Sequence, residues 1–246
     1  YMTLMFECGD ISQEDVPYLG LLKSLLGYVN TSNHGYADLA NAINIYTGGI
    51  SSGISVYPDL QKTGSVCVKY EVRIKVLENN LKDSMALVDE ILTTSDLEDT
   101  KRLGEIIAQV KSRLQVNLSS SGNVVAAMRA LSYQSRYAFY QDATLGIAYY
   151  KLIQKLDEQM KTDPKRVVDK LKALVTKVFV QNRLLVSFTG TKAAYEKAQP
   201  LFVQYFGRLP EGTKAGDMAA IQLSKKNEGF TDASQIQYVA RGGNFK

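Results

Sequence analysis

The chain has 246 residues and a formal net charge of +4, from 29 basic and 25 acidic residues. This length can bury a substantial core, in one large domain or in one and a half smaller ones. Because the two signs of charge are interspersed, we expect no general attraction to phosphate backbones, and nucleic acid is not an obvious partner. No apolar run reaches the roughly 18–20 residues that cross a bilayer, so we also expect no membrane partner.

Strands and helices alternate in the first third of the chain. The strictest pattern covers residues 66–76, where apolar residues alternate with Cys67, Lys69, Glu71, Arg73 and Lys75. One face of this strand is therefore expected to be buried and the other largely wet. Helical spacing of apolar residues and the glycines that follow them define the helices nearby. The predicted elements are strands at 1–8, 53–59 and 66–76, and helices at 16–29 and 36–46.

The next hundred residues are predominantly helical. Ser95 and Glu98, in capping-box spacing, introduce one predicted helix, and Asp163 with Pro164 begins another. Residues 211–232 are rich in Gly, Lys, Thr and Asn, which is typical of a linker. The predicted elements are helices at 81–92, 97–118, 124–140, 145–160, 164–178 and 191–206, and a strand at 183–190.

The two cysteines, Cys8 and Cys67, lie in apolar strand-like segments with no second thiol nearby. Their placement favours two buried thiols over a disulfide framework or a metal site. We therefore expect the cytoplasm of a bacterium or another reducing, soluble compartment. The chain opens without a methionine inside one strand-like run and stops as another finishes, which favours an excised piece of a longer protein.

Two stretches carry a family resemblance, together with the order of the elements: "LANAINIYTGGISSGISVYP" at 39–58 and "YVARGGNF" at 238–245. The chain resembles the insulinase-type, or pitrilysin-type, zinc metallopeptidases, and most of all their presequence-protease-like branch. Within these it is similar to the first domain of the C-terminal half, which is the third of four related domains. The resemblance covers essentially the whole chain, although the helices between the two stretches match only in outline.

The resemblance implies an α+β, metalloprotease-like (processing-peptidase-like) fold, with a mostly antiparallel sheet packed against a block of helices. It implies a non-catalytic domain at residues 1–210. Residues 211–246 would then be a linker and the strand that opens the fourth domain. In this family the two halves close around a peptide, so the expected partners are the catalytic N-terminal half and fourth domain of the same chain, and unstructured peptides.

The family's catalytic domain carries an inverted motif, His-x-x-Glu-His, on its first helix, where two imidazoles and a later glutamate hold zinc and the motif glutamate acts as base. The corresponding positions here are Tyr18, Leu19, Gly20, Leu21 and Leu22, none of which ligates zinc. The sequence contains a single histidine, so no other register restores the motif. The arginine and tyrosine that the family's C-terminal half lends to catalysis lie in the fourth domain. We therefore assign no catalytic, cofactor-binding or metal-binding residue.

Other candidate residues favour structural roles. His34 lies at the turn into the second helix, where it is expected to cap the helix or face water. Tyr133, Tyr137 and Tyr140 fall at helical spacing beside two arginines, a mixture that could stack nucleic-acid bases. The spacing nevertheless favours a core stripe, or a wall of a peptide chamber.

Three further patterns carry little functional signal. "TGTK" at 189–192 lacks the glycine spacing of a phosphate-binding loop and is interpreted as a plain turn. The single Arg-Gly-Gly step at 241–243 continues a strand pattern. The adjacent carboxylates at 89–90 and 157–158 point to different helix faces, so solvated helix surface is expected for them.

The resemblance thus implies a parent zinc endopeptidase that degrades short or unstructured peptides in a closed chamber. This piece would be its non-catalytic scaffold and chamber wall, inert alone, with zinc in the parent and no cofactor in the fragment. Two alternatives stay open: a structural or assembly subunit that uses the same fold without peptidase activity, and a free-standing peptide-binding module. A His-x-x-Glu-His motif encoded upstream would favour the peptidase.

Overall fold

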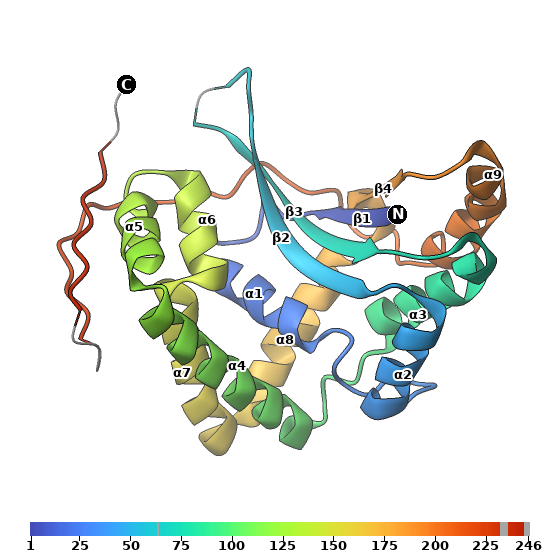
Figure 1. The fold of residues 1–246 in the computed structure, drawn as a ribbon, viewed down its shortest axis with the longest axis horizontal. Coiled ribbons are helices and arrows are strands. Elements are labelled where there is room, and N and C mark those ends of the chain that lie inside the picture. The colour runs from blue at the N-terminus through green and yellow to red at the C-terminus, as the bar shows by residue number, and fades with distance from the viewer. Residues whose placement is uncertain (63, 232–235, 244–246) are drawn as a thin grey trace.

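The computed structural model describes residues 1–62, 64–231 and 236–243, and its centre is a four-stranded antiparallel sheet (Figure 1). The strand order is β2-β3-β1-β4, so the first strand lies inside the sheet. On β1, Leu4 is opposite Val72 on one side and opposite Val186 on the other. The strands are β1 (Met2–Glu7), β2 (Ile50–Pro58), β3 (Val66–Ile74) and β4 (Leu184–Phe188).

Most of the remaining described residues are helical. Three short turns, η1 (Glu78–Asn80), η2 (Gln181–Arg183) and η3 (Phe202–Phe206), join or extend the longer elements. The helices are α1 (Val16–Leu25), α2 (Tyr36–Tyr46), α3 (Leu81–Thr94), α4 (Thr100–Ser120), α5 (Gly122–Ser132), α6 (Arg136–Leu145), α7 (Ile147–Thr162), α8 (Pro164–Val178) and α9 (Lys192–Leu201). The predicted α+β class with a mostly antiparallel sheet is confirmed.

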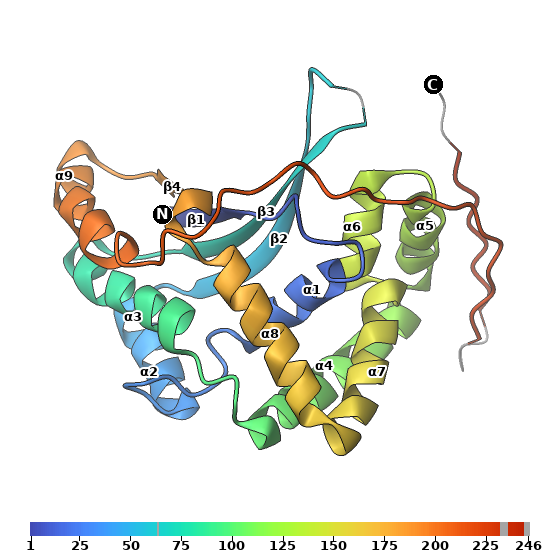
Figure 2. The same ribbon diagram turned by 180° about the vertical axis from the view of Figure 1, so that it is seen from behind.

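Helices cover one face of the sheet. The alternating apolar side chains of β1 and β3 are buried there, and Phe179 at the end of α8 meets two of their rings edge-on. Its ring centroid lies 5.0 Å from that of Phe6 and 5.1 Å from that of Tyr70. In Figure 2, the upper end of α8 lies in front of the strands, whereas in Figure 1 no helix of the described chain lies in front of them. We call the uncovered side, which carries the odd-numbered residues of β1, β2 and β3, the open face.

Several helix boundaries differ from the sequence prediction, and two of these differences have a clear cause in the capping contacts. The helix predicted at 124–140 is in fact two, α5 and α6, because the side chain of Ser135 accepts a hydrogen bond from the Ala138 amide and starts a new helix. The helix predicted from residue 97 begins at Thr100, and its cap is Asp99 rather than a Ser95–Glu98 capping box. The predicted Asp163 cap of α8 is confirmed by a hydrogen bond from the Arg166 amide.

The described part of the C-terminal segment, which begins at residue 211, runs in extended form to the outer side of α5 and α6 (Figures 1 and 2). Residues 211–231 and 236–243 contain no regular helix or strand. The strand pattern predicted at 238–245 is therefore unpaired over residues 238–243, and residues 244 and 245 lie outside the described part. One anchor of this segment is the carbonyl of Gly242, which accepts a hydrogen bond from Gln134 at 2.6 Å.

Candidate functional site

Helix α1, where the resemblance places the zinc motif, is packed closely against other helices. Leu19, Leu21 and Leu22 are fully buried. The carbonyl of Gly20 accepts a hydrogen bond from the hydroxyl of Tyr149 at 2.9 Å, which ties α1 to α7. This stretch of α1 therefore serves packing, and its side chains offer no metal ligand.

Lys23 lies one turn further along α1 in a partly buried position. Its Nζ donates to the carbonyl of Thr144 at 3.1 Å and lies 5.8 Å from the centroid of the Tyr149 ring. Burial lowers the pKa of Lys23 to about 8. No ion pair to this amine occurs within the described residues. Lys23 therefore joins α1 to the end of α6 through its hydrogen bond to Thr144.

His34 is held by a carboxylate that the sequence analysis had placed on solvated helix surface. Glu90 of α3 is buried, and its carboxylate accepts from the Thr31 hydroxyl, from the Asn33 amide at 3.3 Å and from His34 Nδ1 at 2.9 Å. The surface prediction was wrong for Glu90, because the loop between α1 and α2 folds over it and supplies its donors. His34 thus fixes this loop to α3.

The open face of the sheet is polar, but one of its carboxylates is buried. The side chain of Glu71 on β3 is only 1% exposed, although it belongs to the face predicted to be wet. Its Oε2 accepts from Nε and Nη2 of Arg73 at 2.8 and 2.6 Å, and its Oε1 accepts from the Tyr57 hydroxyl. Burial alone would raise the pKa of Glu71, but these hydrogen bonds outweigh it and lower that pKa.

This network was missed by the sequence analysis. The strict alternation in β3 assigns Glu71 to the solvent-facing side of the sheet. It carries no information about how deeply the side chain is buried there. The signal that could have found it is the pair of basic residues, Lys69 and Arg73, two positions away on either side and thus on the same face. Because Glu71 holds two nitrogens of Arg73, the guanidinium has a fixed position on the open face.

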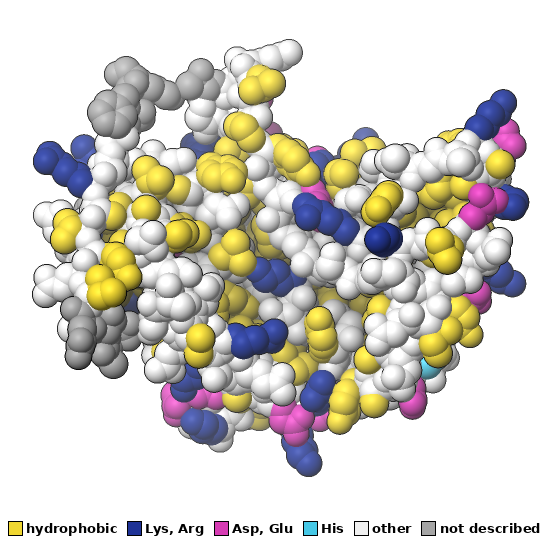
Figure 3. Space-filling model, in the orientation of Figure 1, with side chains coloured by type: hydrophobic (Ala, Val, Ile, Leu, Met, Phe, Trp, Pro, Cys, Tyr) yellow, Lys and Arg dark blue, Asp and Glu magenta, His cyan; other side chains and the backbone are white. Residues whose placement is uncertain are grey.

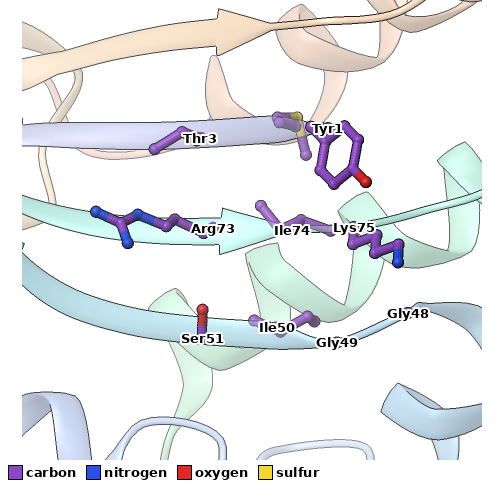
Figure 4. Close-up of a pocket in the computed structure, with 10 residues that line it drawn as sticks. Tyr1, Thr3, Gly48, Gly49, Ile50, Ser51, Arg73, Ile74 and Lys75 are labelled. Atoms are coloured by element: carbon purple, nitrogen blue, oxygen red, sulfur yellow. The ribbon is translucent and has the colours of Figure 1, made fainter.

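A cleft of about 390 Å³ lies at one end of the open face. We call it the strand-end cleft. In Figure 4, Thr3, Arg73 and Ser51 form one row across β1, β3 and β2, and Tyr1, Lys75 and Gly49 form the next. Its lining comprises Tyr1, Met2, Thr3, Gly48, Gly49, Ile50, Ser51, Arg73, Ile74 and Lys75.

The charge of the strand-end cleft is positive. Arg73 and Lys75 both belong to its lining, whereas no described carboxylate does. The side chain of Arg73 is 60% exposed, Lys75 is exposed, and Lys75 forms no ion pair within the described chain. Figure 3, which looks onto this side of the molecule, shows basic side chains over the strands. The cleft can therefore attract an anionic group.

A second network joins α5 and α6 to the C-terminal segment. Arg129 donates from Nη1 to Asp142 at 2.6 Å and from Nε to Glu228 at 2.8 Å, and the Tyr133 hydroxyl also donates to Glu228. The aromatic stripe predicted here is a core feature only at Tyr140, which is fully buried. Tyr137 is 46% exposed, so it faces outward.

The remaining sequence candidates have structural positions. Cys8 is buried and burial raises its pKa to about 12; burial also raises the pKa of the half-buried Cys67. Both thiols are free, and neither has the lowered pKa of a reactive cysteine. The "TGTK" turn caps α9, because Thr191 accepts from the Ala194 amide at 3.1 Å.

No three His, Cys, Asp or Glu side chains come close enough to hold a metal ion in the part of the chain that the structure describes. Within the same residues, no helix is both long and apolar enough to cross a membrane.

Comparison with known proteins places the chain in a family. Residues 1–156 match the family described as peptidase M 16C associated. The chain belongs to this family. Along its full length, this peptidase-associated chain is 31% identical to protein HypA of Clostridium perfringens, of which it covers 25%. It is also 23% identical to presequence protease 1, chloroplastic/mitochondrial, of Arabidopsis thaliana over 248 aligned residues. That alignment covers 99% of this chain and 23% of the Arabidopsis protein.

Solved structures share the fold. A conserved protein from Enterococcus faecalis superposes with a TM-score of 0.56 at 16% identity, covering 87% of this chain and 48% of that chain. A protease from Helicobacter pylori superposes with a TM-score of 0.55 at 13% identity, covering 89% and 47% respectively.

These matches confirm the resemblance to presequence-protease-like peptidases. The peptidase-associated chain spans about a quarter of the length of the curated relatives that it matches. Its sequence holds one histidine, so it cannot contain a His-x-x-Glu-His motif. The chain is thus a non-catalytic region of a peptidase of this family.

Proposed function

We propose that this region is scaffold and chamber wall in a zinc-dependent peptidase that degrades short or unstructured peptides inside a closed chamber. Two relatives' descriptions support a peptidase context: presequence protease 1 of Arabidopsis thaliana and the presequence protease of Drosophila melanogaster. The partners would be the catalytic half and the fourth domain of the same polypeptide. The zinc would belong to the catalytic half.

The observation that carries the proposal is the open face of the sheet. Helices bury one side, while the other side is polar, carries the strand-end cleft and has no helix over it in the described chain. An extended peptide needs such a surface, because its backbone N–H and C=O groups are exposed. Burying these groups against an apolar surface without hydrogen-bond partners costs free energy. The contribution to catalysis would be enclosure and positioning of the peptide.

The packing of α1 supports the non-catalytic part of the proposal. Where a catalytic domain would place its ligands, this helix presents buried leucines and a glycine in contact with Tyr149 and Thr144. We also propose residues 1–210 as the domain and residues 211–246 as the linker leading onward, since the last described turn, η3, ends at Phe206.

Metal analysis and a cleavage assay on the purified chain test this function. After dialysis against a zinc-free buffer, we expect no stoichiometric zinc by mass spectrometry and no hydrolysis of an unstructured peptide. One tightly bound zinc per chain that supports cleavage would overturn the proposal. The longer polypeptide encoded by the gene is expected to cleave the same peptide and to lose this activity with a chelator. A longer polypeptide that lacks the zinc motif and does not cleave would establish the assembly role instead.

A further inference from the structure

The strand-end cleft has features beyond those that a plain wall requires. Its two cations are Arg73 of β3 and Lys75, which follows the end of that strand at Ile74, and in Figure 4 their side chains extend in opposite directions along the strand. Side chains two residues apart repeat at roughly 6.6 Å along a strand. An extended peptide running parallel to β3 repeats its own side chains at the same interval. Because the charged ends of Arg73 and Lys75 diverge, they offer two separate positions along such a peptide rather than two adjacent ones.

Strand β2 leaves room beside these cations. The residues that β2 contributes to the open face opposite Arg73 and Glu71 are Ser51 and Gly53, and Gly49 precedes them. A side chain added at Gly49 or Gly53 would meet no atom within 4 Å, so the space above both is open. A peptide can therefore lie over β2 with its side chains directed at β3.

The cations are available to a ligand in different degrees. Glu71 holds Nε and Nη2 of Arg73, which orients the guanidinium while leaving the side chain 60% exposed. Both oxygens of Glu71 are occupied, one by Arg73 and one by Tyr57, so this buried carboxylate does not reach into the cleft. Lys75 has no carboxylate partner among the described residues. It is the stronger candidate for a new ion pair.

We infer that the strand-end cleft binds acidic side chains of an extended peptide, with Lys75 as the principal contact and Arg73 as a second, separate one. The inference rests on the proposed function, for which it names a preferred class of peptide. Charge complementarity supports it, since the lining holds two exposed cations and no described acid. The preference should weaken with salt, because exposed charge pairs are screened.

Fluorescence anisotropy on the 246-residue chain tests the inference. The probes are two short, labelled, unstructured peptides with blocked termini, one containing Glu-Ser-Glu and the other Gln-Ser-Gln at the same place. We expect the Glu peptide to bind about fivefold more tightly at low salt, as a partly exposed charge pair with Lys75 would give. The substitution Lys75→Gln should remove most of this difference. Its matched control, Lys101→Gln on the exposed surface of α4, should leave the difference unchanged.

A third probe distinguishes binding of a side-chain carboxylate from binding of a terminal carboxylate. It carries the Gln-Ser-Gln sequence with a free terminal carboxylate, and tight binding of this probe alone would overturn the assignment to side chains. Equal affinity for the Glu and Gln peptides, or equal losses in Lys75→Gln and Lys101→Gln, would also overturn it. These outcomes are distinct from failure of the proposed function, which the zinc and cleavage measurements decide. Arg73 is not substituted in this test, because its removal would leave the buried carboxylate of Glu71 without its charged partner.

Discussion

At the scale of single residues, Gly20 shows how tightly α1 is fitted. A methyl group at this position would approach the Cε2 atom of Tyr149 to 3.0 Å and the carbonyl oxygen of Thr144 to 3.1 Å. The second contact is with backbone, which cannot rotate away. The glycine is thus required by the close approach of α1 to α6 and α7.

We predict that Gly20→Ala destabilises the chain by about 1–3 kcal/mol, the usual cost of overpacking. The measurement is the free energy of unfolding from urea titration. Gly104→Ala is the matched control, because Gly104 lies within α4 and a methyl group there meets no atom within 4 Å. That substitution should stabilise the chain by up to about 1 kcal/mol through helix propensity. Equal effects of the two substitutions would contradict the close-packing argument.

Glu90 gives the loop between α1 and α2 a dependence on pH. Burial alone would raise the pKa of Glu90, but hydrogen bonds from Thr31, His34 and Asn33 outweigh it and lower the pKa below 4.5. The unfolded chain therefore takes up this proton first as the pH falls. The stabilisation is present above pH 4.5 and is lost as the pH drops through the lower pKa of the folded state.

We predict that Glu90→Gln lowers the free energy of unfolding at neutral pH by about 1–3 kcal/mol, because buried donors lose a charged acceptor. The deficit relative to wild type should shrink as both proteins are titrated below pH 4.5. Urea titrations across this range provide the measurement. Glu196→Gln, on the exposed side of α9, serves as control and should change little. A deficit that does not vary with pH would show that the carboxylate charge is not its cause.

At the scale of elements, the C-terminal segment is attached to α5 and α6 by one mixed network. Arg129 lies between Asp142, which is buried, and Glu228, which belongs to the segment. Asp142 also accepts from the Ile147 amide at 2.9 Å and thereby caps α7. Arg129 of α5 and Asp142 of α6 thus hold each other in place, and Glu228 joins the C-terminal segment to this pair.

We predict that Glu228→Gln releases the segment without disturbing the helices. Hydrogen exchange over residues 222–231 should become about two- to fivefold faster, as loss of a partly exposed ion pair of about 0.5–1 kcal/mol would give. Exchange mass spectrometry measures this. Glu211→Gln changes an exposed carboxylate in the same segment and should have no effect. Unchanged exchange in Glu228→Gln would show that other contacts hold the segment.

At the scale of the whole molecule, periodicity and capping chemistry account for most of the architecture. The alternating pattern of β3 and the Asp163 cap of α8 each depend on neighbours in sequence, and both are present in the structure. Glu90 and Glu71 could not be placed in this way, because their burial depends on a loop and a strand distant in sequence. The strand-end cleft likewise requires three strand ends to meet.

The central place of β1 has a consequence for synthesis on the ribosome. Residues 2–6 pair on one side with β3 and on the other with residues 184–188, which are made much later. Until β4 emerges, the nascent chain holds a strand with one row of unpaired amides and carbonyls. Such an edge is a template for pairing with another chain, and its closure across a long separation in sequence is slow. The newly made polypeptide is therefore most exposed to misassembly before its fourth strand is complete.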